Sequence, residues 1–385
     1  MRIMLNAISF MPGGMGGTET YFRKLFENLQ VIDSDNCYQV VCGDDVAKEF
    51  ASLQPNFEVA AIRRFSRHDF RRYIFSFLRR GAGFDYIRWS LQRLARDVVH
   101  FPFTEMYPAG LKSPSVLTFW DMQHEFYPDF FSNNELKWRR SHYQSSCEAA
   151  TRIIVASRFT RQNLIERYEI DPGKIDVITV GCGAEYRVID QPELLDGIRK
   201  KYALTRPFLY YPAASWPHKN HLRLLGALKQ LIERFSFEGD LVLTGVVEHV
   251  HDTILREIVR LGLSGRVKVL GFLPYGELPG LYNLARLLVF PSLFEGFGIP
   301  LVEAMACGCP VACSNVTSLP EVIGEAGVMF EPGSVDDIAE SIWSVWSDDA
   351  RLAGMRREGL QRVALFNWET AARKTIAVYR KAGDS

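Results

Sequence analysis

The amino-acid sequence predicts an α/β protein that folds as two domains, each with a parallel sheet. Three observations lead to this prediction: the length of 385 residues, an alternation of short apolar runs with longer segments of helical period, and a restart of that alternation midway along the chain. A chain of this length exceeds the size at which one hydrophobic core usually keeps growing. Short apolar runs separated by helical segments are typical of parallel strands joined by helices.

The candidate strands form two series. The first series contains residues 2–8, 38–43, 57–62, 97–103, 115–121, 152–157 and 176–181. The second series contains residues 207–213, 240–245, 267–272, 287–292, 310–315 and 327–330.

The polar, proline-containing stretch between the two series is typical of a linker. We therefore expect an N-terminal domain at residues 1–188, a linker at 189–206 and a C-terminal domain at 207–366. Residues 367–385 are predicted to form a helix with Asn367 as its N-cap, and we expect this helix to pack back on the first domain.

Composition excludes several classes of partner. Lys plus Arg (45) balances Asp plus Glu (45), so no overall charge attracts a polyanion, and we expect no nucleic-acid partner. The seven cysteines show no CxxC pair and no zinc-like spacing, so we expect reduced thiols and no metal site. The triplet Asp33-Ser34-Asp35 resembles a metal-binding DxD but lies where turn residues are expected. Neither a signal peptide nor a spanning helix is recognisable, which predicts a cytoplasmic protein.

Residues 63–96 hold ten arginines among aromatic residues. They are interpreted either as a helical pair with a solvated face or as a basic amphipathic surface. The second interpretation would allow peripheral contact with anionic lipid at the inner face of the cytoplasmic membrane.

A glycine-rich turn follows the first predicted strand. Residues 11–19 read MPGGMGGTE, and Gly16 and Gly17 immediately precede a helical segment. Such a turn lets the backbone approach a ligand closely, at a helix N-terminus that favours an anion. The spacing does not match the dinucleotide fingerprint G-x-G-x-x-G, so a phosphate or sugar contact is favoured over a dinucleotide site.

Other polar residues follow predicted strands at the position where open α/β sheets collect ligand-binding groups. Asp121 ends one strand, and His124 comes within one turn of it. Either residue can act on a hydroxyl or form part of a structural pair. His218 and Lys219 follow the first strand of the second series, where a lysine is well placed to neutralise a phosphate.

Two glutamates stand in the apolar segment FEGFGIPLVEAMACGCPVACSN. Because Pro300 suits the first turn of a helix and glycines precede it, Glu295 is expected on a loop and Glu303 inside the helix. The unpaired amides of residues 298–301 and the loop carboxylate would suit a ligand with anionic and hydroxyl parts. A nucleotide sugar has this character.

These segments together resemble glycosyltransferase family 4. The E-x7-E of FEGFGIPLVE, the loop GGMGGTE, the segment PHKNH and the run LGFLPYGELPGLYNLARLLVFPSLFEGFG resemble family motifs in order and spacing. The resemblance implies the GT-B fold, in which two Rossmann-like domains face a central cleft. It also implies a retaining reaction without a metal cofactor.

The resemblance further implies roles for individual residues. Glu303 would bind the donor ribose, Glu295 the donor sugar, and Lys219 the diphosphate. Asp121 or His124 would lie beside the acceptor and the donor sugar. The remaining expected donor contacts are Gly16, Gly17, His218, Thr244, Gly245, Phe272, Leu273, Phe297, Gly298, Ile299 and Leu301.

The sequence departs from the family pattern at Ala213-Ala214. Family members often carry Gly-Arg there, with the arginine on the diphosphate. The negative charge must then be met by Lys219, the helix amides, and His218 or another arginine.

We expect transfer of a hexose to a glycan or lipid-linked glycan, with a UDP-hexose favoured as donor and GDP-mannose next. A GT-B-like epimerase or phosphorylase, or a non-catalytic nucleotide-sugar-binding protein, is the alternative.

Overall fold

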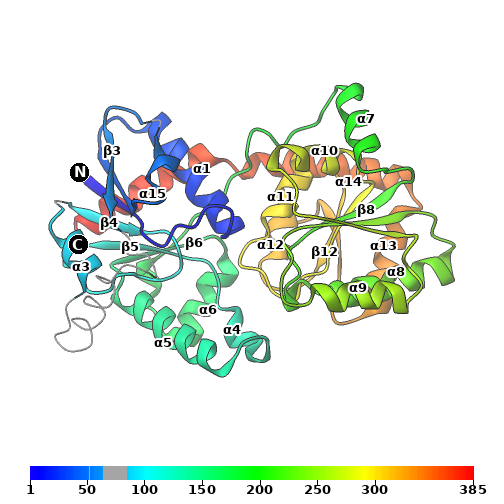
Figure 1. The fold of residues 1–385 in the computed structure, drawn as a ribbon, viewed down its shortest axis with the longest axis horizontal. Helices are drawn as coiled ribbons and strands as arrows, with labels where there is room; N and C mark the ends of the chain where they lie inside the picture. The colour runs from blue at the N-terminus through cyan, green and yellow to red at the C-terminus, as the bar shows by residue number, and fades with distance from the viewer. Residues whose placement is uncertain (52, 64–84, 95) are drawn as a thin grey trace. The chain divides into compact units, whose positions relative to one another are not determined.

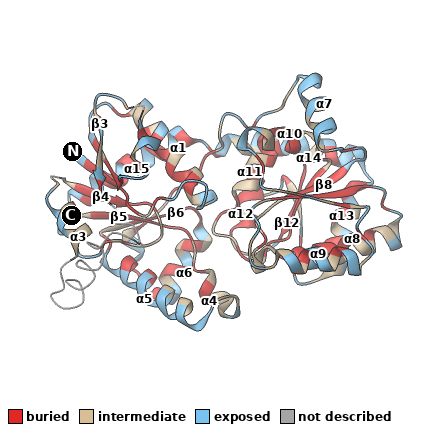
Figure 2. Cartoon of the chain, in the orientation of Figure 1, coloured by how far each residue is buried: buried red, intermediate tan, exposed pale blue. Residues whose placement is uncertain are grey.

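The computed structural model describes residues 1–51, 53–63, 85–94 and 96–385. The chain divides into two compact units, and in each of them helices cover both faces of a parallel sheet (Figure 1). The first unit contains Met1–Val180 and Trp368–Ser385, and the second contains Gly181–Asn367. Within each unit the strands form the buried layer, as Figure 2 shows.

The first unit contains a seven-stranded sheet with the order β3-β2-β1-β4-β5-β6-β7. Every pairing in this sheet is parallel, so the strands end at a common edge. The strands are β1 (Arg2–Ala7), β2 (Cys37–Gly43), β3 (Phe57–Ile62), β4 (Val98–Phe101), β5 (Ser115–Phe119), β6 (Arg152–Val155) and β7 (Ile175–Val177).

The helices of the first unit lie between these strands, apart from the last one, which ends the chain. They are α1 (Gly17–Ile32), α3 (Tyr86–Gln92), α4 (Gln123–Phe126), α5 (Asn133–Ala149), α6 (Arg158–Tyr168) and α15 (Trp368–Gly383). Short 3-10 turns are η1 (Ala47–Phe50), η2 (Pro128–Phe130) and η3 (Pro172–Lys174).

The second unit contains a six-stranded parallel sheet with the order β10-β9-β8-β11-β12-β13. This order matches that of the first six strands of the other sheet, and it is the order of a Rossmann fold. The strands are β8 (Phe208–Pro212), β9 (Asp240–Thr244), β10 (Val267–Gly271), β11 (Leu287–Phe290), β12 (Val311–Ser314) and β13 (Gly327–Phe330). Each strand predicted from the sequence is therefore present.

The helices of the second unit are α7 (Pro192–Lys201), α8 (His221–Phe235), α9 (His251–Arg260), α10 (Leu278–Leu284), α11 (Ile299–Ala306), α12 (Leu319–Ile323), α13 (Val335–Trp346) and α14 (Asp349–Arg362). The 3-10 turns are η4 (Pro217–Lys219), η5 (Tyr275–Glu277) and η6 (Val363–Leu365).

The division between the units differs from the sequence prediction. The second unit begins at Gly181, whereas we expected a linker at 189–206. Within that range the helix α7 forms and packs on α10. Asn283 of α10 also donates to the carbonyl of Arg187 and accepts from the amide of Ile189, both at 2.9 Å. The polar composition of this stretch reflects an exposed helix, because no residue of α7 is buried.

The C-terminal helix belongs to the first unit, as expected. A buried polar chain holds it there, because His100 of β4 is hydrogen-bonded to Tyr379 of α15 and to Thr118 of β5, both at 2.8 Å. Thr118 in turn meets the hydroxyl of Tyr21 on α1 at 3.1 Å. Burial lowers the pKa of His100 to about 3, so this histidine is neutral in the folded protein.

Two further expectations bear on metals and membranes. The DxD triplet forms a turn, in which the Asp33 carboxylate accepts from the amides of Asp35 and Asn36. Across the described residues, no group of His, Cys, Asp and Glu side chains could hold a metal ion, and no helix is long and apolar enough to cross a membrane. Most of the basic segment 63–96, namely residues 64–84 and 95, lies outside the described residues.

Because His100 is neutral when folded but protonates near its ordinary pKa when unfolded, the unfolded chain binds one proton more between about pH 6.5 and 3. Stability therefore falls as the pH drops through this window. We expect the wild-type protein to lose about 1.4 kcal/mol per pH unit more than His100→Gln between about pH 5.5 and 4.

Urea unfolding followed by circular dichroism measures this difference. His142→Gln is the matched control, because His142 lies on the exposed surface of α5 and should leave the wild-type slope unchanged. Parallel slopes for the wild type and His100→Gln would contradict the assignment.

Candidate functional site

The expected donor-binding residues of the second unit follow the carboxyl ends of its strands. Lys219 lies in η4 after β8, and Glu295 lies on the loop after β11. These two strands are neighbours in the sheet and pair through Leu209 with Leu287 and Tyr210 with Leu288. Parallel strands that lie side by side bring the loops at their carboxyl ends together, so the topology places Lys219 beside Glu295.

Lys219 and Glu295 form an ion pair. The Lys219 Nζ lies 2.5 Å from Glu295 Oε1, and the two side chains are 17% and 13% exposed. The lysine also lies over the ring of Phe290, 5.7 Å from its centroid. Charges this close to solvent can exchange partners, so a phosphate can take the lysine while a sugar hydroxyl donates to the carboxylate.

The backbone around Lys219 is held by buried hydrogen bonds. The hydroxyl of Tyr211 donates to the Lys219 carbonyl at 2.7 Å. Asn220, in the left-handed conformation with φ 61°, donates its amide to the carbonyls of Pro291 and Pro332, both at 2.9 Å. The amide therefore ties the η4 turn to the loop that carries Glu295. This loop geometry limits the freedom of the ion pair.

The helix α11 begins as the sequence predicted. Gly298 is its N-cap with φ 101°, and a Cβ there would lie 2.7 Å from Leu319 Cδ2, so only glycine fits without strain. The amides of this turn are fewer than expected, because Pro300 has no N–H and the Leu301 amide donates to the Gly298 carbonyl at 3.0 Å. The Leu301 side chain is fully buried, so its expected donor contact, which stays a prediction, could come only from the backbone.

The environment of Glu303 differs sharply from that of Glu295. Its Oε2 accepts a 2.7 Å hydrogen bond from the hydroxyl of Tyr282 on α10. Burial raises the pKa of Glu303 to about 7, while the hydroxyls of Tyr282 and Tyr186 act to lower it. The carboxylate is thus held between charged and neutral forms near neutral pH. The sequence showed an acid in an apolar helix but not the tyrosines that surround it.

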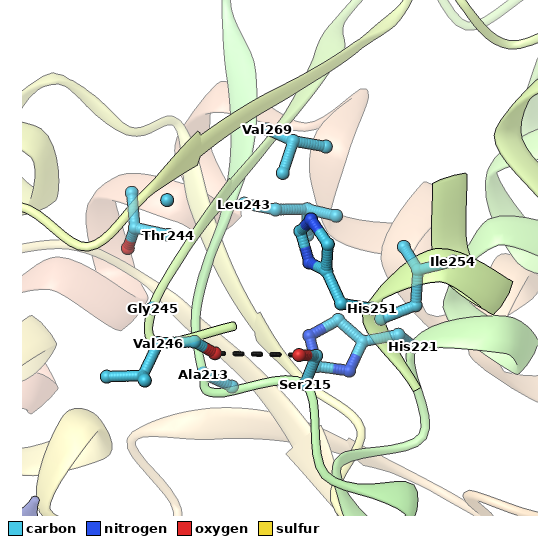
Figure 3. Close-up of a pocket in the computed structure, with 11 residues that line it drawn as sticks. Ala213, Ser215, His221, Leu243, Thr244, Gly245, Val246, His251, Ile254 and Val269 are labelled. Atoms are coloured by element: carbon cyan, nitrogen blue, oxygen red, sulfur yellow. Dashed lines mark hydrogen bonds between the residues drawn. The ribbon is translucent and has the colours of Figure 1, made fainter. Parts of the chain in front are cut away.

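A small cavity of about 20 Å³ lies at the carboxyl ends of β8, β9 and β10 (Figure 3). Thr244 and Gly245, both expected donor contacts, line it. Ser215, His221 and His251 also line the cavity, and sequence reasoning did not identify them. His221 is part of the PHKNH segment, but the sequence does not show that its side chain points into this cavity.

The other predicted side chains of the second unit fall into two groups. Phe272 is 57% exposed and contacts Tyr275 edge-on, with ring centroids 6.1 Å apart. Leu273 and Phe297 are buried, so they can offer mainly backbone groups to a ligand. His218 uses its carbonyl to accept from the Leu293 amide at 2.8 Å, which again joins the loops after β8 and β11.

In the first unit, a glutamate at the end of the glycine-rich turn, Glu19, accepts a hydrogen bond from the backbone of the same turn. Gly16 is the N-cap of α1 with φ 53°. The amide of Gly13 donates to Glu19 Oε2 at 2.7 Å, and Glu19 pairs with Arg23 at 2.9 Å. An anion at this turn would therefore meet a nearby carboxylate. The role expected for Gly16 and Gly17 at the donor phosphates stays a prediction.

Asp121 and His124 are placed differently. Asp121 is half-buried and accepts from the amide of Gln123 at 3.0 Å, as in an Asx turn. His124 is completely buried; its Nε2 lies 3.0 Å from the Tyr168 hydroxyl, and burial lowers its pKa to about 4. His124 therefore has no exposed atom that a substrate could contact. Asp121 is partly exposed, so of the two it is the better candidate to contact a substrate.

Two family models match this chain, one on each half. A family model described as "Glycosyltransferase Family 4" matches residues 15–186, and one described as "Glycosyl transferases group 1" matches residues 196–362. In structure, the chain is similar to Anabaena HepE in complex with UDP and glucose, with a TM-score of 0.76, 18% identity, and coverage of 98% of each chain.

Two curated relatives come from Escherichia coli. The chain is 30% identical to O-antigen chain mannosyltransferase B over 292 residues, which cover 76% of each protein. It is 36% identical to serotype-specific mannosyltransferase WbdA over 232 residues, which are 60% of this chain but only 28% of that protein. The strand order is that of two Rossmann-like units, and Lys219 and Glu295 of the family-like motifs follow the carboxyl ends of strands in the second sheet. The chain belongs to glycosyltransferase family 4 and has the GT-B fold.

Proposed function

We propose that this protein transfers a hexose, with retention of anomeric configuration, from a nucleotide-diphosphate sugar to a hydroxyl of a surface-polysaccharide glycan or its lipid-linked precursor. The observation that carries the proposal is the Lys219–Glu295 ion pair beside the start of α11. It sets a cation for a departing phosphate next to a carboxylate for sugar hydroxyls.

The names of the relatives bear on the donor. Both curated E. coli relatives are named mannosyltransferases, and the first is named for the O-antigen chain. On the support of these names, we propose GDP-mannose as the donor ahead of the UDP-hexose expected from the sequence. The HepE structure was solved with UDP and glucose, but at 18% identity it supports the fold and not the donor.

The proposed reaction breaks the bond between the anomeric carbon and the phosphate oxygen and forms a bond from that carbon to the acceptor oxygen. Positive charge develops on the sugar and negative charge on the leaving diphosphate. Lys219 and the amides at the start of α11 meet the negative charge, and Glu295 orients the sugar through its hydroxyls. In front-face retention the leaving phosphate accepts the proton of the acceptor hydroxyl. We propose that Lys219 takes the part that a metal ion plays in other transferases.

A panel of UDP, GDP and ADP with their sugars tests the nucleotide. At about one hundred times its dissociation constant, a ligand adds about 2.7 kcal/mol to stability, which a thermal shift detects readily. We expect GDP and GDP-mannose to give the largest shifts. If no nucleotide or nucleotide sugar raises the melting temperature, the transferase proposal is wrong.

Two substitutions separate binding from turnover. Lys219→Met should weaken nucleoside diphosphate binding by about tenfold to a hundredfold, since it removes a charge-assisted hydrogen bond. Glu295→Gln frees the lysine, so nucleotide affinity should hold or rise, whereas transfer should fall by on the order of a hundredfold. Isothermal titration and a transfer assay measure the two effects.

The matched control for this pair is Lys229→Met. Lys229 lies on α8 and pairs with Glu233 at 2.8 Å in a surface i,i+4 contact. It should keep wild-type affinity and turnover. Unchanged transfer in Glu295→Gln would remove Glu295 from the mechanism.

Retention has its own test. We expect an α-configured donor sugar to give an α-linked product when the anomeric proton is followed by NMR during transfer. A β-linked first product would show inversion and would exclude the front-face mechanism.

A further inference from the structure

Glu303 sits in a cluster of tyrosines to which the sequence analysis assigned no role. Tyr282 is completely buried and donates to Glu303 Oε2 at 2.7 Å. The Tyr186 side chain also interacts with this carboxylate, and its ring meets that of Tyr282 edge-on with centroids 5.9 Å apart. The nearby Tyr210 directs its hydroxyl elsewhere, to Thr244 Oγ1 at 2.9 Å. Two of the three hydroxyls therefore serve Glu303.

The tyrosines of this cluster and Glu303 differ in how far they are exposed to solvent. Tyr282 and Tyr186 are buried, but Glu303 itself is only half-buried. The neighbours of Glu303 on its helix are apolar, and removing a carboxylate from water costs free energy. A glutamate that bound nothing would therefore be unfavourable at this position. The tyrosines occupy part of its hydrogen-bonding capacity, and a carboxylate has about four acceptor positions in all. Acceptor capacity is left for a ligand on the partly exposed side.

We propose that Tyr282, assisted by Tyr186, is a positioning residue that fixes the Glu303 carboxylate to accept hydrogen bonds from the ribose hydroxyls of the donor. This inference rests on the proposed function, and it adds residues from two segments outside the E-x7-E motif. Tyr282 comes from α10, and Tyr186 comes from the stretch that opens the second unit.

The electrostatics of the cluster provide a signature. The pKa of Glu303 is raised to about 7, chiefly by burial, and the two tyrosine hydrogen bonds lower it from a still higher value. The titratable groups that interact with Glu303 are Tyr282, Tyr186, Tyr210, Glu185 and Cys307. Removing a tyrosine hydroxyl should raise the pKa of Glu303, so less of it is ionised at neutral pH.

The test is the pH dependence of donor affinity. GDP-mannose and UDP-glucose serve as probes because the phosphates of a nucleotide sugar do not titrate near pH 7. Wild-type affinity should rise with pH through a midpoint near the Glu303 pKa of about 7. In Tyr282→Phe the midpoint should move up by about one pH unit, with about fivefold weaker binding at pH 7 and less than twofold at pH 8.5. Tyr186→Phe should shift the midpoint in the same direction by less.

Two controls define the result. Glu303→Gln should bind weakly at every pH and lose the midpoint. Tyr38→Phe removes a buried hydroxyl that donates to a carboxylate in the other unit, Asp33 Oδ2 at 2.6 Å, and should keep the wild-type midpoint. A change in packing alone would lower affinity at all pH values without moving the midpoint.

The outcomes distinguish the two levels of inference. If wild-type protein binds a nucleotide sugar but Tyr282→Phe has the same midpoint, the positioning role is overturned and the proposed function stands. A wild-type midpoint that persists in Glu303→Gln would overturn it too. If neither probe binds the wild type at any pH, the proposed function falls together with the inference.

Discussion

The pairing of β8 with β11 is the constraint on which the candidate site depends. In the order β10-β9-β8-β11-β12-β13, these strands meet where the direction of strand succession reverses. Lys219 follows one of them and Glu295 follows the other, 76 residues later in the chain. Their ion pair and the bonds from Asn220 to two prolyl carbonyls all join loops that only this adjacency brings together. If β8 had a different neighbour in place of β11, Lys219 and Glu295 would not lie side by side, even with the same sequence.

The two glutamates of the E-x7-E segment are separated by environment as well as by sequence. Glu295 sits near the surface with a cationic partner, Lys219, which compensates its charge. Among the described residues no cation pairs with Glu303, which accepts hydrogen bonds from hydroxyl donors and has a pKa raised by its burial. One carboxylate is therefore suited to exchange its partner for a substrate, whereas the other is suited to hold a fixed direction. Different surroundings thus give identical side chains different electrostatic environments.

The fold was predictable because its signals are local. Each strand is a short apolar run, and Gly298 with Pro300 marked the start of α11 within the correct turn. The sequence could not reveal in which direction individual side chains point, and part of the candidate site depends on these directions. His124 is only three residues from Asp121 in the sequence, yet its ring is buried in the core beside Tyr168. Tyr186 and Tyr282 lie 96 residues apart, and nothing in either segment indicates that both reach Glu303. The α7 helix was missed because an exposed polar helix has the composition of a linker.

The absence of an arginine at Ala213-Ala214 has a structural counterpart. The loops after β8 and β9 pack backbone against backbone, since the Ala213 amide donates to the Thr244 carbonyl at 2.8 Å. A Cβ on Gly245 would lie 2.4 Å from the Ala213 carbonyl oxygen, so the second loop must carry glycine at this point. Ser215 continues the contact, accepting from the Glu248 amide at 2.6 Å. Main-chain contacts thus fix this part of the site, and alanine stands where family members often carry an arginine. In the function that we propose, more of the leaving-group charge would then fall on Lys219, whose position the buried bonds around Asn220 hold in place.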